Sequence, residues 1–225
     1  MKIAHLYYDL MNLHGEQGNI MALKKSFAQQ KIDLEVDLLS IGDNIDFKAY
    51  DLFYIGMGSE ENLILVLEDI KKYHKDIKDT IKNKQYFIAT GNAYELFGKS
   101  IEINNKEHQA LNIFNYTSKE SPKRIVGECL MTFKDLKPII GFKNHGNIVD
   151  NENNHLFEAL KENSFEGYYE DNFFGTHLIG PLLIRNPHFT EYIVKDILKD
   201  NYQIPDQDYQ DQAYEEYIKN FYENS

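Results

Sequence analysis

Residues 88–98 (IATGNAYELFG) have the layout of a strand, a sharp glycine turn and a short helix. A nucleophile elbow has this layout, because its turn presents one side chain at the end of a strand, where backbone N–H groups stabilise a thiolate or an oxyanion. An ordinary turn of an α/β fold that requires glycine would give the same pattern. The segment alone does not separate these two interpretations.

Few other side chains are suited to nucleophilic or acid–base chemistry. The single cysteine, Cys129, lies in the alternating segment 124–133 beside Leu130 and Met131, and we interpret it as a buried core thiol. His145, in the polar sequence 144–147 (NHGN), is interpreted as part of a turn, with a site-lining residue as the alternative. Thr90 precedes the glycine turn, so its hydroxyl is expected to point away from the turn.

No metal ion or cofactor is predicted for this chain. Its eight histidines are scattered without the short spacing that metal ligands require. A glycine loop of the G-x-x-x-x-G-K-[ST] kind is absent from the sequence, so ATP use is not expected of this chain.

The elements that would position these residues alternate between apolar strands and helices. Strands are predicted at 2–7, 32–39, 51–56 and 85–90, and helices at 19–30, from 60 onward with Ser59 as N-cap, at 93–98 and at 187–200. Such alternation predicts an α/β fold with a mostly parallel sheet flanked by helices. Its ligand site should lie beyond the carboxyl ends of the strands, where the loops 8–18, 56–61 and 90–94 would meet.

The middle of the chain, residues 101–150, has a different character. Residues 124–133 alternate with period 2, residues 138–142 resemble another strand, and residues 172–176 predict one more strand after this region. We expect the segments 124–133 and 138–142 to be antiparallel additions to the sheet.

Length and charge limit the classes of function. The 225 residues fit one domain with a possible appendage, and 24 basic against 36 acidic residues give a net charge of −12. This charge argues against nucleic acid as a partner. One cysteine cannot form an intramolecular disulfide, which favours a cytoplasmic location, and no apolar run is long enough for membrane insertion.

The acidity is concentrated at the C-terminus. The last 26 residues hold seven acidic groups and one lysine, a net charge of 1 − 7 = −6. Tyr214, Tyr217, Ile218 and Phe221 nevertheless share one helical face. We therefore divide the chain into a domain at 1–200 and an acidic, tyrosine-rich helix or tail at 201–225. A helix packed on the body is favoured over a solvated tail or a partner-docking helix.

Five segments follow one another in an order that is typical of one family. They are residues 5–20 (HLYYDLMNLHGEQGNI), 56–60 (GMGSE), 90–98 (TGNAYELFG), 141–146 (GFKNHG) and 175–187 (GTHLIGPLLIRNP). In this order they resemble the CobB/CobQ-like class I glutamine amidotransferases, and among these the amidotransferase subunits of lipid II isoglutaminyl synthases. The resemblance covers residues 1–200 and implies a class I glutamine amidotransferase-like (flavodoxin-like) fold.

The resemblance implies a subunit that hydrolyses glutamine through a Cys–His pair. Ammonia would pass to a Mur-ligase-like, ATP-dependent partner that amidates the D-glutamate of the peptidoglycan stem peptide, and a heterodimer is expected. In such chemistry a thiolate attacks the carboxamide, a histidine transfers the protons and backbone N–H groups bind the oxyanion. The resemblance implies substrate-binding roles for Arg124, Gly58 and Asn92, with glutamine or a related small amino acid as the ligand; an ordinary surface-strand arginine is the alternative for Arg124.

The sequence departs from the family pattern at the catalytic positions. The family's elbow reads approximately Ile-Cys-Gly-Gly-Tyr-Gln-Leu-Leu-Gly, which places Gly91 at the nucleophile. The family's histidine segment reads approximately Gly-Thr-Tyr-Leu-His-Gly-Pro, which places Ile179 at the base. Met57 stands where glycine is usual in the oxyanion loop, and Ser59 stands where glutamine is usual.

Three hypotheses follow from these departures. The first is an amidotransferase-like subunit that keeps the fold and its partner but does not hydrolyse glutamine. The second is an active amidase with rearranged chemistry, in which His177, two residues from the base position, acts as a substitute. The third is a stand-alone binding protein for glutamine or another small amino acid.

Overall fold

Alternating apolar strands and helices form a six-stranded, mostly parallel sheet in the computed structural model, which describes residues 1–151, 153–161, 163–206 and 209–223. In order across the sheet, its strands are β11 (Tyr168–Glu170), β12 (Phe173–Thr176), β4 (Tyr86–Thr90), β3 (Leu52–Ile55), β1 (Lys2–Leu6) and β2 (Glu35–Leu39). Only β11 is antiparallel to its neighbour. The predicted fold class is confirmed.

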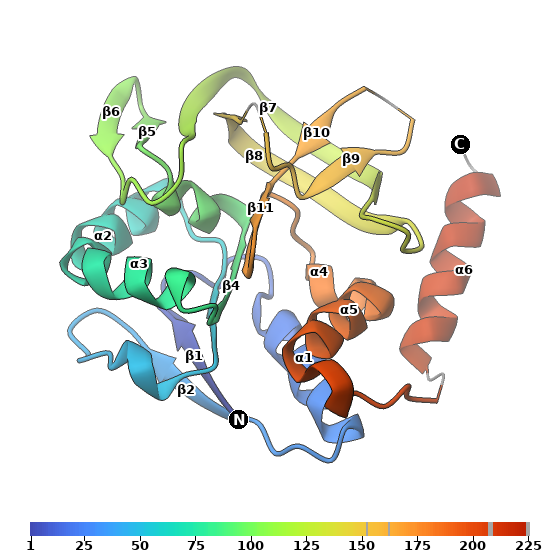
Figure 1. Cartoon of the computed structure of the whole chain (residues 1–225). Helices are drawn as coiled ribbons and strands as arrows, with labels where there is room; N and C mark the ends of the chain where they lie inside the picture. Colours follow the sequence, from blue (N-terminus) through green and yellow to red (C-terminus); the bar gives the residue numbers. More distant parts are fainter. Residues whose placement is uncertain (152, 162, 207–208, 224–225) are drawn as a thin grey trace.

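Helices cover both faces of this sheet because its strands are apolar on both sides (Figure 1). Phe53 and Ile55 of β3 join the core cluster under α2 (Glu60–Ile70) and α3 (His74–Lys82), whereas Leu52 and Tyr54 join the opposite cluster. That second cluster lies under α1 (Gln17–Gln29), α4 (Leu182–Arg185) and α5 (Pro187–Leu198).

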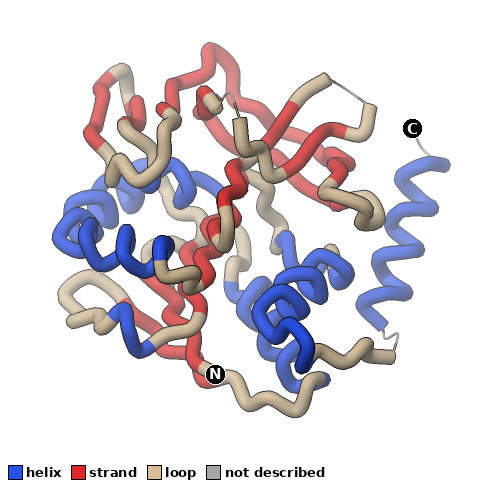
Figure 2. The backbone as a smooth tube through the Cα atoms, viewed as in Figure 1, coloured by secondary structure: helices blue, strands red, loops and turns tan. Residues whose placement is uncertain are grey.

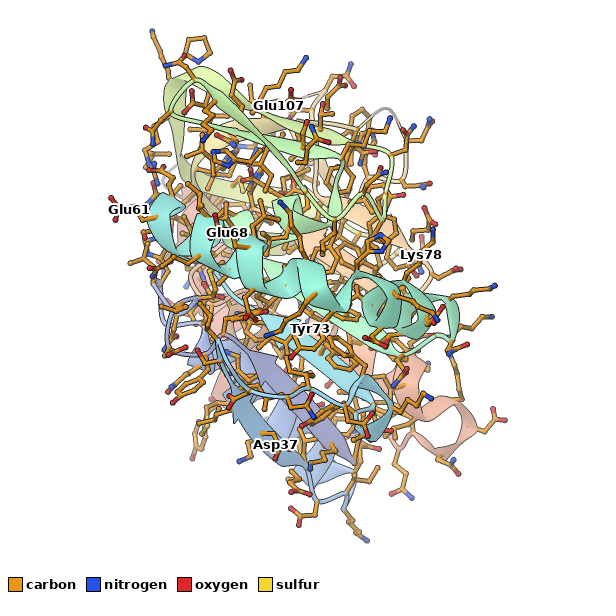
Figure 3. All side chains as sticks on the ribbon, turned by 90° about the vertical axis from the view of Figure 1, so that its left-hand side faces the viewer. Asp37, Glu61, Glu68, Tyr73, Lys78 and Glu107 are labelled. Carbon is orange, nitrogen blue, oxygen red and sulfur yellow. The ribbon has the colours of Figure 1, made fainter. Side chains whose placement is uncertain are left out.

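The predicted long helix after Ser59 is interrupted. A 3₁₀ turn, η2 (Lys71–Tyr73), separates α2 from α3. Figure 3 looks onto this face and shows Glu61 and Glu68 on the outer side of α2, with Tyr73 below the helices. The Tyr73 hydroxyl donates a hydrogen bond to the Asp43 carbonyl at 2.7 Å, which ties this turn to the loop after β2.

The segments predicted as antiparallel additions belong instead to a second, mostly antiparallel sheet (Figure 2). Its strands are β5 (Ser100–Ile103), β6 (Lys106–Gln109), β7 (Thr117–Thr132), β8 (Ile139–Asp150), β9 (Phe157–Ala159) and β10 (Phe165–Glu166). Among the described strands of this sheet, only β5 and β7 pair in parallel. β7 and β8 form a long antiparallel pair, and residues 144–147 lie inside β8, so the predicted turn there is wrong. The pairing with β7 resumes on both sides of Gly146, at His145 with Ile125 and at Asn147 with Glu120, across a register shift in β7, so this polar sequence stays in the strand.

A separate C-terminal helix, α6 (Tyr209–Glu223), packs against the second sheet (Figure 1). Tyr214 is buried against Leu130 and Ile140, and Tyr217, Ile218 and Phe221 pack on the same cluster. Residues 207, 208, 224 and 225 of the C-terminal segment lie outside the described ranges. In the part of the chain that is described, no helix is both long and apolar enough to cross a membrane.

Candidate active site

The three predicted loops meet at the carboxyl ends of β1, β3 and β4. Leu13 N–H donates to the Met57 carbonyl at 2.9 Å, and the Asn62 side chain donates to the Leu10 carbonyl at 2.9 Å. The loop after β4 joins them because Asn92 bonds to Gly58. Ser59 Oγ accepts from Asn62 N–H at 3.1 Å, which confirms the predicted N-cap of α2.

Gly91 begins the turn after β4 with the backbone shape of an elbow. Its φ of +63° is a left-handed conformation, and the chain continues directly into the 3₁₀ helix η3 (Gly91–Phe97). A nucleophile elbow requires such a sharp strand-to-helix turn. The backbone geometry of the elbow is therefore present, and its central residue carries no side chain.

Met57 fills the space that a side chain at position 91 would enter. A Cβ atom built on Gly91 would lie 2.6 Å from Met57 Cγ and 3.0 Å from Met57 Sδ, and even closer to Met57 Cβ. Rotation of the Met57 side chain cannot relieve this overlap, since the closest atom, Cβ, is fixed by the backbone. Gly91 and Met57, two of the departures from the family pattern, thus form one complementary pair.

The Asn92 side chain forms hydrogen bonds with the backbone of Gly58, in the segment 56–60 that resembles the family's oxyanion loop. Its Oδ1 accepts a hydrogen bond from Gly58 N–H at 3.1 Å, and its Nδ2 donates to the Gly58 carbonyl at 2.9 Å. The Gly58 N–H is the group that would face an oxyanion if this loop acted as the resemblance implies. In this structure, a neighbouring side chain already satisfies that donor.

The predicted base position is apolar and buried. Ile179 is 2% exposed, and its N–H donates to the Phe142 carbonyl of β8 at 3.0 Å. This contact is an isolated antiparallel bridge that fastens the segment after β12 to the second sheet. A hydrocarbon side chain at this place cannot transfer a proton.

His177 lies nearby, but both of its ring nitrogens have protein partners. Nε2 is 2.9 Å from Glu95 Oε1, and Nδ1 is 3.3 Å from the Tyr94 hydroxyl. With Nε2 donating to the carboxylate and Nδ1 accepting from Tyr94, all three side chains have a hydrogen-bond partner. The other Glu95 oxygen accepts from Ser118 and from Asn147 Nδ2.

His145 stacks on His177 and completes a buried wall. The two rings are 4.0 Å apart at an interplanar angle of 9°. His145 Nδ1 is 2.6 Å from the Asn147 carbonyl, and burial lowers the pKa of His145 to about 3. We call Glu95, His145 and His177 the histidine wall. Sequence reasoning did not foresee it, because its members come from three elements and only the fold brings them together.

A pocket of about 210 Å³ lies in front of the histidine wall and is lined by all three predicted substrate-binding residues, Arg124, Gly58 and Asn92. Arg124 Nε donates to Asn144 Oδ1 at 2.7 Å, and its Nη2 donates to the Asn144 carbonyl at 3.2 Å. Its Nη1 is 3.8 Å from Glu60 of the oxyanion loop. The guanidinium is thus held at the pocket by β8, beside an acidic group.

The remaining candidates lie away from this pocket. Cys129 is partly buried in β7 and packs on the core cluster under α1. It does not line the front pocket and is not part of the histidine wall. The Thr90 hydroxyl donates to Glu16 at 2.6 Å and contacts Tyr54 at 2.8 Å, pointing away from the turn as expected. Glu16 was missed by sequence reasoning. Its burial raises the pKa of the carboxyl, which Thr90, Tyr54 and Asn19 hydrogen-bond.

The model of the CobB/CobQ-like glutamine amidotransferase domain matches residues 2–187. The chain belongs to the CobB/CobQ-like glutamine amidotransferase family. Two relatives are named lipid II isoglutaminyl synthase (glutamine-hydrolyzing) subunit GatD. The chain is 28% identical to the one from Streptococcus pneumoniae, over 97% of this chain and 87% of the relative, and 26% identical to the one from Staphylococcus aureus, over 87% and 83%.

Solved structures support the same fold for this CobB/CobQ-like chain. PurLQS from Thermotoga maritima superposes with a TM-score of 0.56 at 12% identity, over 96% of this chain and 98% of that one. At this identity the likeness concerns the fold alone. The family model ends at residue 187, so α6 lies outside the matched region.

Proposed function

We propose that this chain is the amidotransferase-like subunit of a lipid II isoglutaminyl synthase-type complex and that it does not hydrolyse glutamine. The observation that carries the proposal is the Met57 side chain, which fills the space of the missing nucleophile at Gly91. A thiolate or hydroxyl at the elbow is the group that attacks a carboxamide, and neither has room here. The names of the two curated relatives support the assignment to this type of complex.

The proposed partner is a Mur-ligase-like subunit that binds ATP and amidates the D-glutamate of the stem peptide in a heterodimer with this chain. In this arrangement the partner uses free ammonia, and the chain acts as a scaffold or regulator. The front pocket with Arg124 remains a predicted binding site for glutamine or a related small amino acid.

The experiment compares nitrogen donors. The chain is co-purified with its Mur-ligase-like partner, and amidation of the lipid II stem peptide is followed with either glutamine or ammonium as the donor. We expect amidation with ammonium, no amidation with glutamine and no release of glutamate. Glutamate release above the level of the partner alone would contradict the proposal.

The second hypothesis, an amidase that uses His177 as its base, can be tested separately. The Nδ1–Tyr94 contact and the burial of His177, which is 3% exposed, argue against a base role, because the ring nitrogen that could accept a proton already faces the Tyr94 hydroxyl. If glutamate release were observed, His177→Gln should abolish it under this hypothesis. An unchanged rate in that variant would exclude His177 as the base.

A further inference from the structure

A second and larger pocket lies behind the histidine wall. Its volume is about 380 Å³, within the range of roughly 300–1,000 Å³ typical of small-molecule sites. His145 borders both pockets, while Tyr94 and His177 face only the rear one.

Part of the polar floor of the rear pocket is hydrogen-bonded within the protein, whereas His145 Nε2 and Ser164 Oγ, which also line this pocket, have no hydrogen-bond partner among the described residues. Glu166 is buried, and its two oxygens accept from His177 N–H at 2.6 Å and from Thr176 Oγ1 at 2.5 Å. Tyr94 and His177 meet edge to face, with ring centroids 4.6 Å apart. A ligand would therefore meet a preformed surface, which lowers the cost of ordering the site on binding.

Lys143 supplies the one ammonium group among the described residues that line this pocket. It has neither a hydrogen bond nor an ion pair to any described residue, although it lies near enough to His145 and Glu166 to act on them electrostatically. The Glu166 carboxyl accepts its hydrogen bonds from Thr176 and the His177 N–H rather than from Lys143, so the ammonium group of Lys143 can still donate hydrogen bonds to an anion.

The opposite side of the pocket is apolar. Ile125, Ile148 and Val149 come from the β7–β8 pair, and Phe165 from β10. Ile148 is 51% exposed and Phe165 is 50% exposed, so hydrocarbon surface is open to a ligand at the mouth. The Phe165 ring also stacks on His155 at 4.3 Å, which fixes its orientation.

We propose that the rear pocket binds a small monocarboxylate with an apolar body, the carboxylate at Lys143 and the body against Ile148, Val149 and Phe165. A single ammonium group and the nearby Glu166 favour a singly charged head group over a phosphate dianion. This inference does not depend on the proposed function, since the front pocket and the elbow take no part in it.

Calorimetric titration of the full chain tests the proposal with three probes of the same carbon skeleton. They are 4-methylpentanoate, L-leucine and 4-methylpentan-1-ol. We expect a carboxylate-bearing probe to bind with one site per chain and at least tenfold more tightly than the alcohol. Preference between the first two probes distinguishes a simple carboxylic acid from an amino acid as the source of the carboxylate.

Two variants locate the binding site. Lys143→Gln should weaken carboxylate binding at least tenfold, whereas Lys119→Gln, an exposed lysine of β7 outside the pocket, should leave it unchanged. Ile148→Asp, at an exposed position, should also weaken binding at least tenfold, because it sets a like charge beside the carboxylate. Failure of both carboxylates to bind, or equal effects of Lys143→Gln and Lys119→Gln, would overturn the proposal.

Discussion

The Cβ atom of Met57 lies where a side chain at position 91 would begin, and this contact explains two sequence departures together. A residue with a Cβ at position 91 needs a residue without one at position 57. The Asn92 side-chain amide adds a second local interaction, because it hydrogen-bonds to both the N–H and the carbonyl of Gly58. At the scale of single residues, the turn at Gly91 is thus closely packed against Met57 and hydrogen-bonded through Asn92.

Gly91→Cys alone should destabilise the protein by about 2 kcal/mol or more, because overpacking and a positive φ both act against the new side chain. Adding Met57→Gly should recover part of that loss, since it removes the overlapping atoms. Chemical denaturation of the two variants measures the difference. If Gly91→Cys alone were as stable as the parent chain, the backbone at Met57 would have to move aside at little cost, which would contradict this prediction.

Restoring only the nucleophile and base, with Gly91→Cys and Ile179→His, should give no measurable glutaminase activity. The overlap with Met57 remains in that variant, and Asn92 still occupies the Gly58 N–H. Adding Met57→Gly and Asn92→Gly should raise glutamate release above the background of the double variant. Full turnover from the double variant alone would contradict the role given to these two side chains.

At the scale of elements, the β7–β8 pair and α6 determine what surrounds the site. β8 supplies Asn144, which holds Arg124, as well as His145 and Asn147 of the buried network. α6 packs on the other end of the same pair, against Leu130 and Ile140. The β7–β8 pair therefore contacts the site at one end and α6 at the other, and α6 follows the residues 2–187 that the family model matches.

Tyr214 is the main anchor of α6. Its side chain is 4% exposed, and its hydroxyl donates to the Pro138 carbonyl at 2.8 Å. Tyr214→Ala should cost about 3 kcal/mol of unfolding free energy, and Tyr214→Phe about 1 kcal/mol for the lost hydrogen bond. Thermal denaturation should show no comparable change for Tyr209→Ala, because Tyr209 is 86% exposed. Similar effects at 209 and 214 would argue against this packing.

The sequence predicted the parallel sheet and the meeting of its three loops, because strand and helix periodicity carries that information locally. It did not predict that β8 would continue through 144–147, since the pairing of these residues with β7 is a long-range contact. The histidine wall was hidden for the same reason. Glu95 and His177 are distant in sequence, and β4 and β12 become neighbours only in the folded sheet.

At the scale of the whole molecule, buried histidines link stability to pH. Burial lowers the pKa of His5 to about 4, of His145 to about 3 and of His188 to about 4. A histidine with a lower pKa in the folded state stabilises the fold fully above its unfolded value near 6.5. That stability is lost as the pH falls from there toward 3–4, because the unfolded chain binds the extra protons. Glu16 and Glu166, whose pKa values burial raises, act in the opposite direction.

His145→Gln should therefore reduce the acid sensitivity of the protein. The parent chain should lose on the order of 2–3 kcal/mol through this group between pH 7 and pH 4, and the variant should lose correspondingly less. Unfolding free energies at several pH values measure the slope. His108→Gln, at a partly exposed position of the edge strand β6, is the control, and an identical slope in all three proteins would refute the assignment.

The Met57–Gly91 pair also bears on how such a chain could evolve. Met57→Gly as a first step leaves a cavity in place of a side chain that is 4% exposed, at a cost of about 2–4 kcal/mol. Gly91→Cys as a first step meets the Met57 side chain. In either order the first substitution gives a less stable protein, so a side chain at position 91 is accommodated only when positions 57 and 91 change together.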